Sequence, residues 1–190
     1  MSDLAYGALG YQGYENPSFL STPGAKDVGI EFYTFSKTFN MAGWRLAFAA
    51  GNDQMIEALN LIQDHLFVGI FPALQEAGIA ALLDPKSEEA VAQLNATYDS
   101  RRDAFVQAAA KIGWQAFPSR GSFYAWMPVP EGYTSESFAD LLLEKVHVAV
   151  APGKGFGPAG DAYVRIGLLV EPERLVEAVD RIANLHLFNN

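Results

Sequence analysis

The sequence contains no cysteine. This absence excludes disulfide bridges, zinc sites built on thiolates and cysteine nucleophiles, and it fits a reducing compartment. Basic residues are also few, because 13 Lys and Arg stand against 22 Asp and Glu and give a formal charge of −9 at pH 7. Since binding to nucleic acid depends on clustered basic side chains, this balance argues against a nucleic-acid partner.

Long apolar runs are absent as well, because no stretch reaches the roughly 18 apolar residues that a membrane-spanning helix needs. The first residues, Met1, Ser2 and Asp3, lack the basic and then apolar pattern of a signal peptide. We therefore expect a cytoplasmic protein without a membrane partner. The composition, 50% hydrophobic and 18% charged residues, is typical of a chain that folds around a core, and 190 residues suit one large domain or two small ones.

Apolar and turn-forming residues predict an α/β region followed by an α+β region. After thirty residues of short strands and turns, β-prone runs predict two buried strands, over residues 30–35 and 46–50. Helical spacing then predicts a helix that begins at Asn52, a second over 72–83 and a long one over 87–113. Further along, strands are predicted over 114–117, 122–127, 147–151 and 162–168, and helices over 135–145 and 172–187.

Lys37 is the first candidate for chemistry. It follows the predicted strand 30–35, and hydroxyl side chains flank it at Thr34, Ser36 and Thr38. A lysine pressed against apolar walls loses part of the stabilisation of its ammonium form, so that its free amine can attack a carbonyl and form a Schiff base. The alternative is a strand-end lysine whose stem packs while its charged end reaches water, and for an isolated lysine this is the commoner case.

Three further features favour a chemical role for Lys37. Arg45 follows eight residues later, across a glycine-containing stretch, and a guanidinium can bind a phosphate through two parallel hydrogen bonds. Asp3 and Tyr6 lie upstream and supply the carboxylate and phenol that a pyridine nitrogen and a phenolic oxygen require. Arg165 is a cation inside an apolar strand, where a charge rarely occurs without an anionic partner.

The segments around these residues resemble the fold-type I pyridoxal-phosphate enzymes, and specifically the C-terminal half of the class I/II aminotransferases. The matching segments, in the family's order, are Asp3-Leu4-Ala5-Tyr6, residues 36–45, Gly121-Ser122-Phe123-Tyr124, Pro152-Gly153 and Tyr163-Val164-Arg165. The resemblance implies an α/β fold in which a partial mixed-sheet large domain is followed by a small α+β domain. The implied division is the C-terminal portion of the cofactor-binding large domain over 1–84, a connecting long helix over 85–113 and the small C-terminal domain over 114–190.

The resemblance also implies three catalytic residues, which bind the cofactor as well. Lys37 would hold pyridoxal 5'-phosphate as a Schiff base, be displaced by the substrate amine and then move the proton during the reaction. Asp3 would keep the pyridine nitrogen protonated, which strengthens the ring as an electron sink. Tyr6 would donate a hydrogen bond to the ring oxygen.

Four binding contacts are implied in the same way. Thr34, Ser36 and Arg45 would bind the cofactor phosphate, with Thr34 and Arg45 as the main contacts. Arg165 would bind the α-carboxylate of the substrate through two parallel hydrogen bonds, which fixes the bond to be broken relative to the ring.

The implied activity is transamination between an L-amino acid and a 2-oxo acid, a reaction of amino-acid metabolism, in a homodimer. The family's upstream half cannot be placed in this sequence, so we expect the 190-residue chain to be inactive or very weak on its own and the parent protein to be the enzyme. Two alternatives stay open. One is a pyridoxal-phosphate-dependent C–S lyase of the cystathionine type, and the other is a non-catalytic module that retains the fold.

Other patterns point to no additional chemistry. Residues 155–160 satisfy G-x-G-x-x-G, but a strand rather than a helix is predicted after them, so no helix N-terminus would face a pyrophosphate. The three histidines are widely spaced and lack companions at metal-ligand spacing, so no metal site is predicted. Tyr124 and Trp126 occupy alternate positions of a predicted strand, where packing into the core is the commoner role.

Overall fold

The computed structural model describes residues 1–117 and 119–188. The chain forms two compact units, Met1–Asn95 (unit 1) and Ala96–Asn190 (unit 2), and each is described by itself. The three-part division made from the sequence stays a prediction. Within the part of the chain that the structure describes, no helix combines the length and the apolar character needed to cross a membrane.

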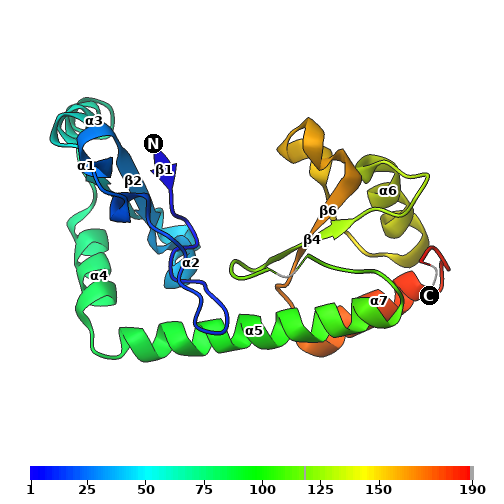
Figure 1. Ribbon diagram of the computed structural model, residues 1–190. Helices are drawn as coiled ribbons and strands as arrows, with labels where there is room; N and C mark the ends of the chain where they lie inside the picture. Colours follow the sequence, from blue (N-terminus) through cyan, green and yellow to red (C-terminus); the bar gives the residue numbers. More distant parts are fainter. Residues whose placement is uncertain (118, 189–190) are drawn as a thin grey trace. The chain divides into compact units, whose positions relative to one another are not determined.

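Unit 1 contains a three-stranded mixed sheet in the order β1–β2–β3 (Figure 1). β1 (Ser2–Asp3) runs parallel to β2 (Ile30–Thr34), with Asp3 opposite Phe32. β3 (Ala47–Gly51) runs antiparallel to β2, with Ala47 opposite Thr34. The two strands predicted from the apolar runs are therefore present in a mixed sheet. The expectation that both are buried is wrong for β3, which has no buried residue.

The helices of unit 1 begin where the sequence carries start signals. They are α1 (Ala25–Val28), α2 (Phe35–Thr38), α3 (Asp53–Leu66) and α4 (Pro72–Leu83), with the 3-10 turns η1 (Phe19–Ser21) and η2 (Ala42–Trp44), and α5 (Ser87–Lys111) begins here and continues into unit 2. The side chain of Asn52 caps α3 by accepting a hydrogen bond from the backbone N–H of Met55, at 3.1 Å. Pro72 occupies the first turn of α4, where its missing N–H costs nothing.

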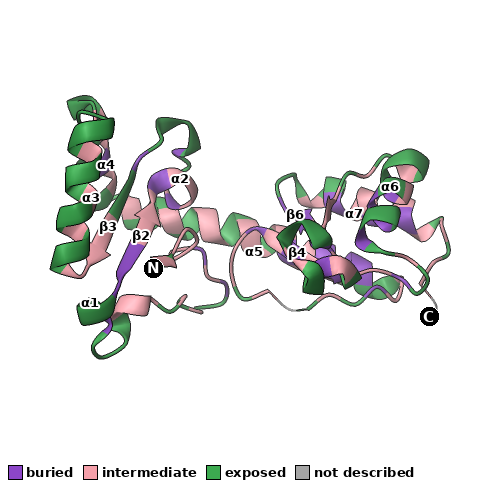
Figure 2. Cartoon of the chain, turned by 90° about the horizontal axis from the view of Figure 1, so that it is seen from above, coloured by how far each residue is buried: buried purple, intermediate pink, exposed green. Residues whose placement is uncertain are grey.

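The apolar core of unit 1 is small. Its buried cluster consists of Phe35, Met41 and Leu46, and α4 packs closely on it because a Cβ at Gly78 would lie only 2.7 Å from Leu46 Cδ2. α3 buries none of its residues, and α4 buries Gly78 alone. Large apolar side chains of both helices are therefore exposed, with Leu83 at 75% (Figure 2).

Unit 2 contains an antiparallel sheet in the order β4–β6–β5. β4 (Tyr124–Pro128) pairs with β6 (Tyr163–Gly167), with Trp126 opposite Arg165, and β5 (Ala151–Pro152) pairs with β6 on its other side. The remaining elements are α6 (Ser135–Val146), α7 (Pro172–Ala183) and the 3-10 turns η3 (Gly153–Phe156) and η4 (Pro158–Ala162). Alternation along the strands sends Ala125 and Met127 of β4 toward one face, where the helices cover them.

That face is the core of unit 2. Its buried residues come from α5, β4, β6, α6 and α7 and from the segments that follow α5 and β6: Phe105, Ala108, Ala109, Trp114, Ala125, Met127, Phe138, Leu142, Val164, Ile166, Leu168, Leu175, Val179 and Ile182. The spacing of the last three residues is that of one face of an amphipathic helix, so α7 packs on the core through this face.

Four local predictions are wrong. Residues 114–117 form no strand. The backbone N–H of Trp114 donates to Ala109 O at the C-terminal end of α5, and its indole packs into the core. The strand predicted over 147–151 is reduced to Ala151–Pro152, because His147 adopts a left-handed conformation (φ 56°) that ends α6. α7 ends at Ala183 rather than at residue 187. Lys37 lies in the short helix α2 and not at a strand end.

Candidate active site

The junction of β2 and α2 carries three of the predicted site residues. Thr34 is the last residue of β2, and its side chain caps α2 by accepting a hydrogen bond from Ser36 N at 3.1 Å. The Thr34 hydroxyl also donates to Ser36 Oγ at 2.9 Å. Lys37 follows in the same helical turn and is half-buried. The sequence Thr-x-Ser-Lys therefore folds into a capped turn that places two hydroxyls and one amine just beyond the end of the central strand.

Pairing of β2 with β3 brings Arg45 back to this junction. Thr34 lies opposite Ala47, and Phe35 N donates to Leu46 O at 3.1 Å, so the strand pairing continues up to the residues next to Arg45. Arg45 itself has a left-handed backbone (φ 53°), an exposed side chain, and one hydrogen bond from Nη1 to Ala42 O at 3.0 Å. The β2–β3 pairing therefore brings the Arg45 backbone back toward this junction, and contact of its guanidinium with a phosphate stays a prediction.

Asp3 and Tyr6 follow the neighbouring strand. β1 is parallel to β2, and Leu4 N donates to Phe32 O at 2.9 Å, so both strands run toward the same edge of the sheet (Figure 1). Tyr6 lies in the turn after β1, where its carbonyl oxygen accepts from Asn16 Nδ2 at 3.0 Å. Residues that follow the carboxyl ends of adjacent parallel strands share one edge, which is where α/β sheets bind ligands.

Arg165 belongs to unit 2, on the face of the sheet opposite the core. Its guanidinium carbon lies 4.1 Å from the ring centroid of Tyr124 and 4.2 Å from that of Phe156. Trp126 and Tyr163 stack beside it, with centroids 5.6 Å apart. Among residues 1–117 and 119–188, no carboxylate forms an ion pair with this guanidinium.

We call the five rings on this side, from Phe117, Tyr124, Trp126, Phe156 and Tyr163, the aromatic face. The expectation that Tyr124 and Trp126 pack into the core is wrong, since the core takes the residues between and after them. Sequence reasoning therefore missed Tyr124 and Phe156 as neighbours of Arg165. Strand alternation could have placed Tyr124 on the same face of the sheet as Arg165, because each occupies a position between the buried residues of its strand. It could not have indicated Phe156, which lies in η3.

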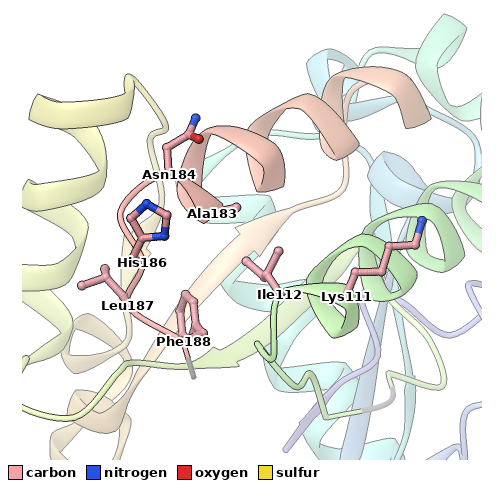
Figure 3. Close-up of a pocket in the computed structure, with 7 residues that line it drawn as sticks. All are labelled: Lys111, Ile112, Ala183, Asn184, His186, Leu187 and Phe188. Carbon is pink, nitrogen blue, oxygen red and sulfur yellow. The ribbon is translucent and has the colours of Figure 1, made fainter. Parts of the chain in front are cut away.

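Three other features of the chain concern possible binding sites: the glycine-rich segment 155–160, the candidate metal ligands and a cavity in unit 2. Residues 155–160 lie in η3 and η4 and lead into the strand β6, as predicted, so no helix begins after the G-x-G-x-x-G pattern to bind a dinucleotide. Within the described ranges, no group of three His, Cys, Asp or Glu side chains is arranged to hold a metal ion. A cavity of about 650 Å³ near the ends of α5 and α7 is lined by residues such as Lys111 and His186, and none of the predicted site residues takes part in it (Figure 3).

Comparison with known proteins identifies the family. The sequence model described as aminotransferase class I and II matches residues 1–182. The chain belongs to this family of aminotransferases. Among curated proteins, it is 59% identical to the L-glutamine--4-(methylsulfanyl)-2-oxobutanoate aminotransferase of Bacillus subtilis, over 98% of the chain and 46% of that protein. It is 47% identical to the LL-diaminopimelate aminotransferase of Moorella thermoacetica, over 95% of the chain and 46% of that protein.

The structural comparison agrees with this assignment. The solved apo-BacF structure from Bacillus subtilis matches with a TM-score of 0.92 and 45% identity, over 99% of the chain and 48% of that chain. The fold-type I class predicted from the sequence is thereby confirmed. The aminotransferase chain spans about half the length of the curated relatives that it matches.

Members of this family depend on pyridoxal phosphate, and the residues present fit that cofactor. Lys37 offers an amine for an aldehyde, Asp3 a carboxylate for a ring nitrogen, and the hydroxyls at the β2–α2 junction with Arg45 offer donors for a phosphate. The turn that carries Arg45 is also roomy, because a Cβ added at Gly43 would meet nothing within 4 Å.

Proposed function

We propose that the protein containing this chain is a pyridoxal-phosphate-dependent aminotransferase that moves an amino group between an L-amino acid and a 2-oxo acid. The observation that carries the proposal is the β2–α2 junction, where a capped turn sets Thr34, Ser36 and Lys37 beside the hairpin that returns Arg45. The 59% identity to a named transaminase supports the same reaction class.

Each residue of unit 1 has a role suited to its chemistry. When bound, the cofactor supplies an electron sink for the negative charge that develops at the substrate Cα. Lys37 would hold the cofactor through Nζ, and its amine, once displaced by the amine of the substrate, would act as the base that accepts the proton from Cα. Asp3 keeps a proton on the ring nitrogen, and Tyr6 donates a hydrogen bond to the ring oxygen.

The remaining contacts are binding contacts. Thr34, Ser36 and Arg45 bind the phosphate with hydroxyl and guanidinium donors, which anchors the cofactor at the edge of the sheet. Arg165 binds the substrate α-carboxylate. Because no carboxylate among the described residues forms an ion pair with it, its donors are available for that ligand. A cytoplasmic homodimer, with amino acids and 2-oxo acids as its small-molecule partners, completes the proposal.

The test uses the complete polypeptide that carries this chain. Lys37→Ala should lower kcat/KM by a factor of at least about 10², the range for loss of a positioned acid–base group, and borohydride should leave a cofactor label on the Lys37 peptide of the unmodified protein only. Lys26→Ala is the matched control, because Lys26 is exposed on α1 and lies outside the site. L-glutamine with 4-(methylsulfanyl)-2-oxobutanoate is a suitable first substrate pair.

Product analysis separates this proposal from the alternatives. A transaminase yields a new 2-oxo acid and a new amino acid in equal amounts. Pyruvate, ammonia and a thiol in place of these products would assign a C–S lyase, and full activity of Lys37→Ala would remove the lysine from the mechanism. We expect the 190-residue chain by itself to show little or no turnover.

A further inference from the structure

The guanidinium of Arg165 is held by aromatic rings rather than by a carboxylate. Tyr124 and Phe156 each place a ring centroid close to its central carbon, at 4.1 Å and 4.2 Å. Attraction between a cation and a ring face uses the positive charge but none of the five N–H donors. An internal ion pair would have used those donors, and the described residues form none with Arg165.

The two rings reach Arg165 from separate elements. Tyr124 is the first residue of β4, diagonal to Arg165 across the β4–β6 pairing, and its ring also packs on Phe123 at 4.8 Å. Phe156 ends η3 in the segment between β5 and β6, and its side chain is 52% exposed. An exposed phenylalanine in contact with a cation contributes little to a core, so its position calls for another explanation.

The segment that carries Phe156 is held in place by contact between two glycines, Gly153 before Phe156 and Gly160 after it. A Cβ on Gly153 would lie 2.2 Å from Gly160 O, and one on Gly160 would lie 2.1 Å from Gly153 O, so the two backbones touch and only glycine fits at both positions. The buried Ser135 hydroxyl donates to Asp161 Oδ1 at 2.8 Å, and this hydrogen bond connects α6 to η4. These contacts hold η3 and η4 together, so Phe156 is presented from a rigid support.

We propose that Tyr124 and Phe156 are positioning residues that hold the Arg165 guanidinium by its face and leave its N–H edge free for a substrate carboxylate. This rests on the proposed function, in which Arg165 binds the α-carboxylate. Planar restraint without hydrogen bonds orients the guanidinium before the ligand arrives, so less rotational freedom is lost on binding. Amino acid and 2-oxo acid both carry this carboxylate, so the two rings serve both half-reactions.

The first test examines the restraint itself on the 190-residue chain, without substrate or cofactor. In NMR spectra of arginine-labelled protein, the Nε–Hε signal of Arg165, identified by its disappearance in Arg165→Lys, should lie upfield because of the ring currents. Phe156→Leu should move it toward the position of an exposed arginine, and Phe156→Tyr should keep it in place. Phe117→Leu is the matched control, since Phe117 is exposed on the aromatic face and packs on Tyr163. An Arg165 signal that Phe156→Leu leaves unmoved would overturn the proposal.

The second test measures the consequence in the complete polypeptide. Phe156→Leu should raise KM for the amino acid and for the 2-oxo acid together by about 5-fold, the factor expected from loss of one partly desolvated cation–π contact, with kcat nearly unchanged. Phe156→Tyr should restore both values, and Phe117→Leu should leave them unchanged. A fall in kcat with unchanged KM would contradict a positioning role. The Lys37→Ala experiment tests the proposed function, and the NMR experiment tests the restraint of Arg165. Either result can be negative while the other is positive, so failure of one proposal can be told from failure of the other.

Discussion

Units 1 and 2 are similar in length but differ in how they are stabilised. Among the described residues, the buried cluster of unit 2 has fourteen members, drawn from three helices, two strands and the residues next to them, whereas that of unit 1 has three. Unit 1 exposes the apolar side chains of α3 and α4 instead of burying them (Figure 2). Because apolar burial is the main stabilising contribution to folding, we expect the unit that carries Lys37 to be the less stable of the two.

Unit 1 relies on polar side chains where unit 2 relies on apolar packing. The carboxylate of Glu31, buried on β2, accepts hydrogen bonds from Ser18 Oγ at 2.6 Å, Phe19 N at 2.7 Å and Ser2 Oγ at 2.9 Å. The amide of Asn16 donates to the carbonyls of Tyr6, Gly7 and Leu9. These contacts order the irregular first thirty residues, and they do so without adding to the apolar core.

Separating the units tests this difference most directly. Residues 87–190, which keep all of α5, should fold with dispersed amide signals and a cooperative thermal transition, because the core of unit 2 is complete within them. Residues 1–86 should show weak dispersion and bind a hydrophobic dye, because their apolar cluster is small. A cooperative transition in residues 1–86 would show that a three-residue buried cluster, scattered buried side chains and polar contacts suffice.

Truncation of one aromatic side chain in each unit gives the next largest effect. Trp114 is 1% exposed, packs on Phe105 and Phe138, and donates from Nε1 to Pro128 O at 2.7 Å. Trp114→Ala should cost about 3–5 kcal/mol through lost burial and the remaining cavity. Phe35→Ala should cost less, because the residues packed around its small cluster are only partly buried and can move into the space.

Native-state hydrogen exchange measures the two substitutions separately, because the amides of each unit report its own opening free energy. Trp114→Ala should lower the protection of β4 and β6, and Phe35→Ala that of β2 and β3. Equal losses in the two units would contradict the difference in core size.

The sequence predicted the elements whose boundaries are set locally. Pro72 and Pro172 mark the first turns of α4 and α7, and the polar residue Asn52 caps α3 as expected. The errors arise where tertiary contacts decide the conformation. Trp114 belongs to a β-prone residue type, yet the burial of its indole in the core determines its backbone conformation. His147 adopts a left-handed conformation, which histidine favours only weakly, so the sequence alone does not place the end of α6 there.

The candidate site divides in the same way. Thr34, Ser36, Lys37 and Arg45 lie in one continuous motif, so their proximity follows from a single strand, turn and hairpin. The neighbours of Arg165 come from elsewhere in the chain, and their arrangement depends on β4–β6 pairing and on a loop fixed by two touching glycines. A local pattern cannot reveal a ring that approaches from another element.

Glu31 gives the smallest of the expected effects and tests the polar half of the comparison. Burial alone raises the pKa of Glu31, but the hydrogen bonds from Ser18, Phe19 and Ser2 outweigh it, so the pKa lies below the ordinary value of 4.5. Glu31→Gln should lower the protection of β2 by about 1–2 kcal/mol at pH 7, the usual cost of weakening charge-assisted hydrogen bonds. Glu57→Gln, at an exposed position of α3, is the matched control and should have no effect.

The pH dependence provides a sharper criterion for Glu31. A carboxyl group whose pKa is lowered by folding stabilises the folded state fully above its ordinary pKa, and this contribution is lost as the pH falls through the lowered value. The difference in β2 protection between the unmodified chain and Glu31→Gln should therefore be constant from pH 7 down to about 4.5 and shrink at lower pH. Protonated glutamic acid and glutamine are nearly the same shape, so the two chains should converge in acid. A difference that persists unchanged in acid would mean that shape, rather than the ionised carboxylate, holds β1 and η1 to the central strand.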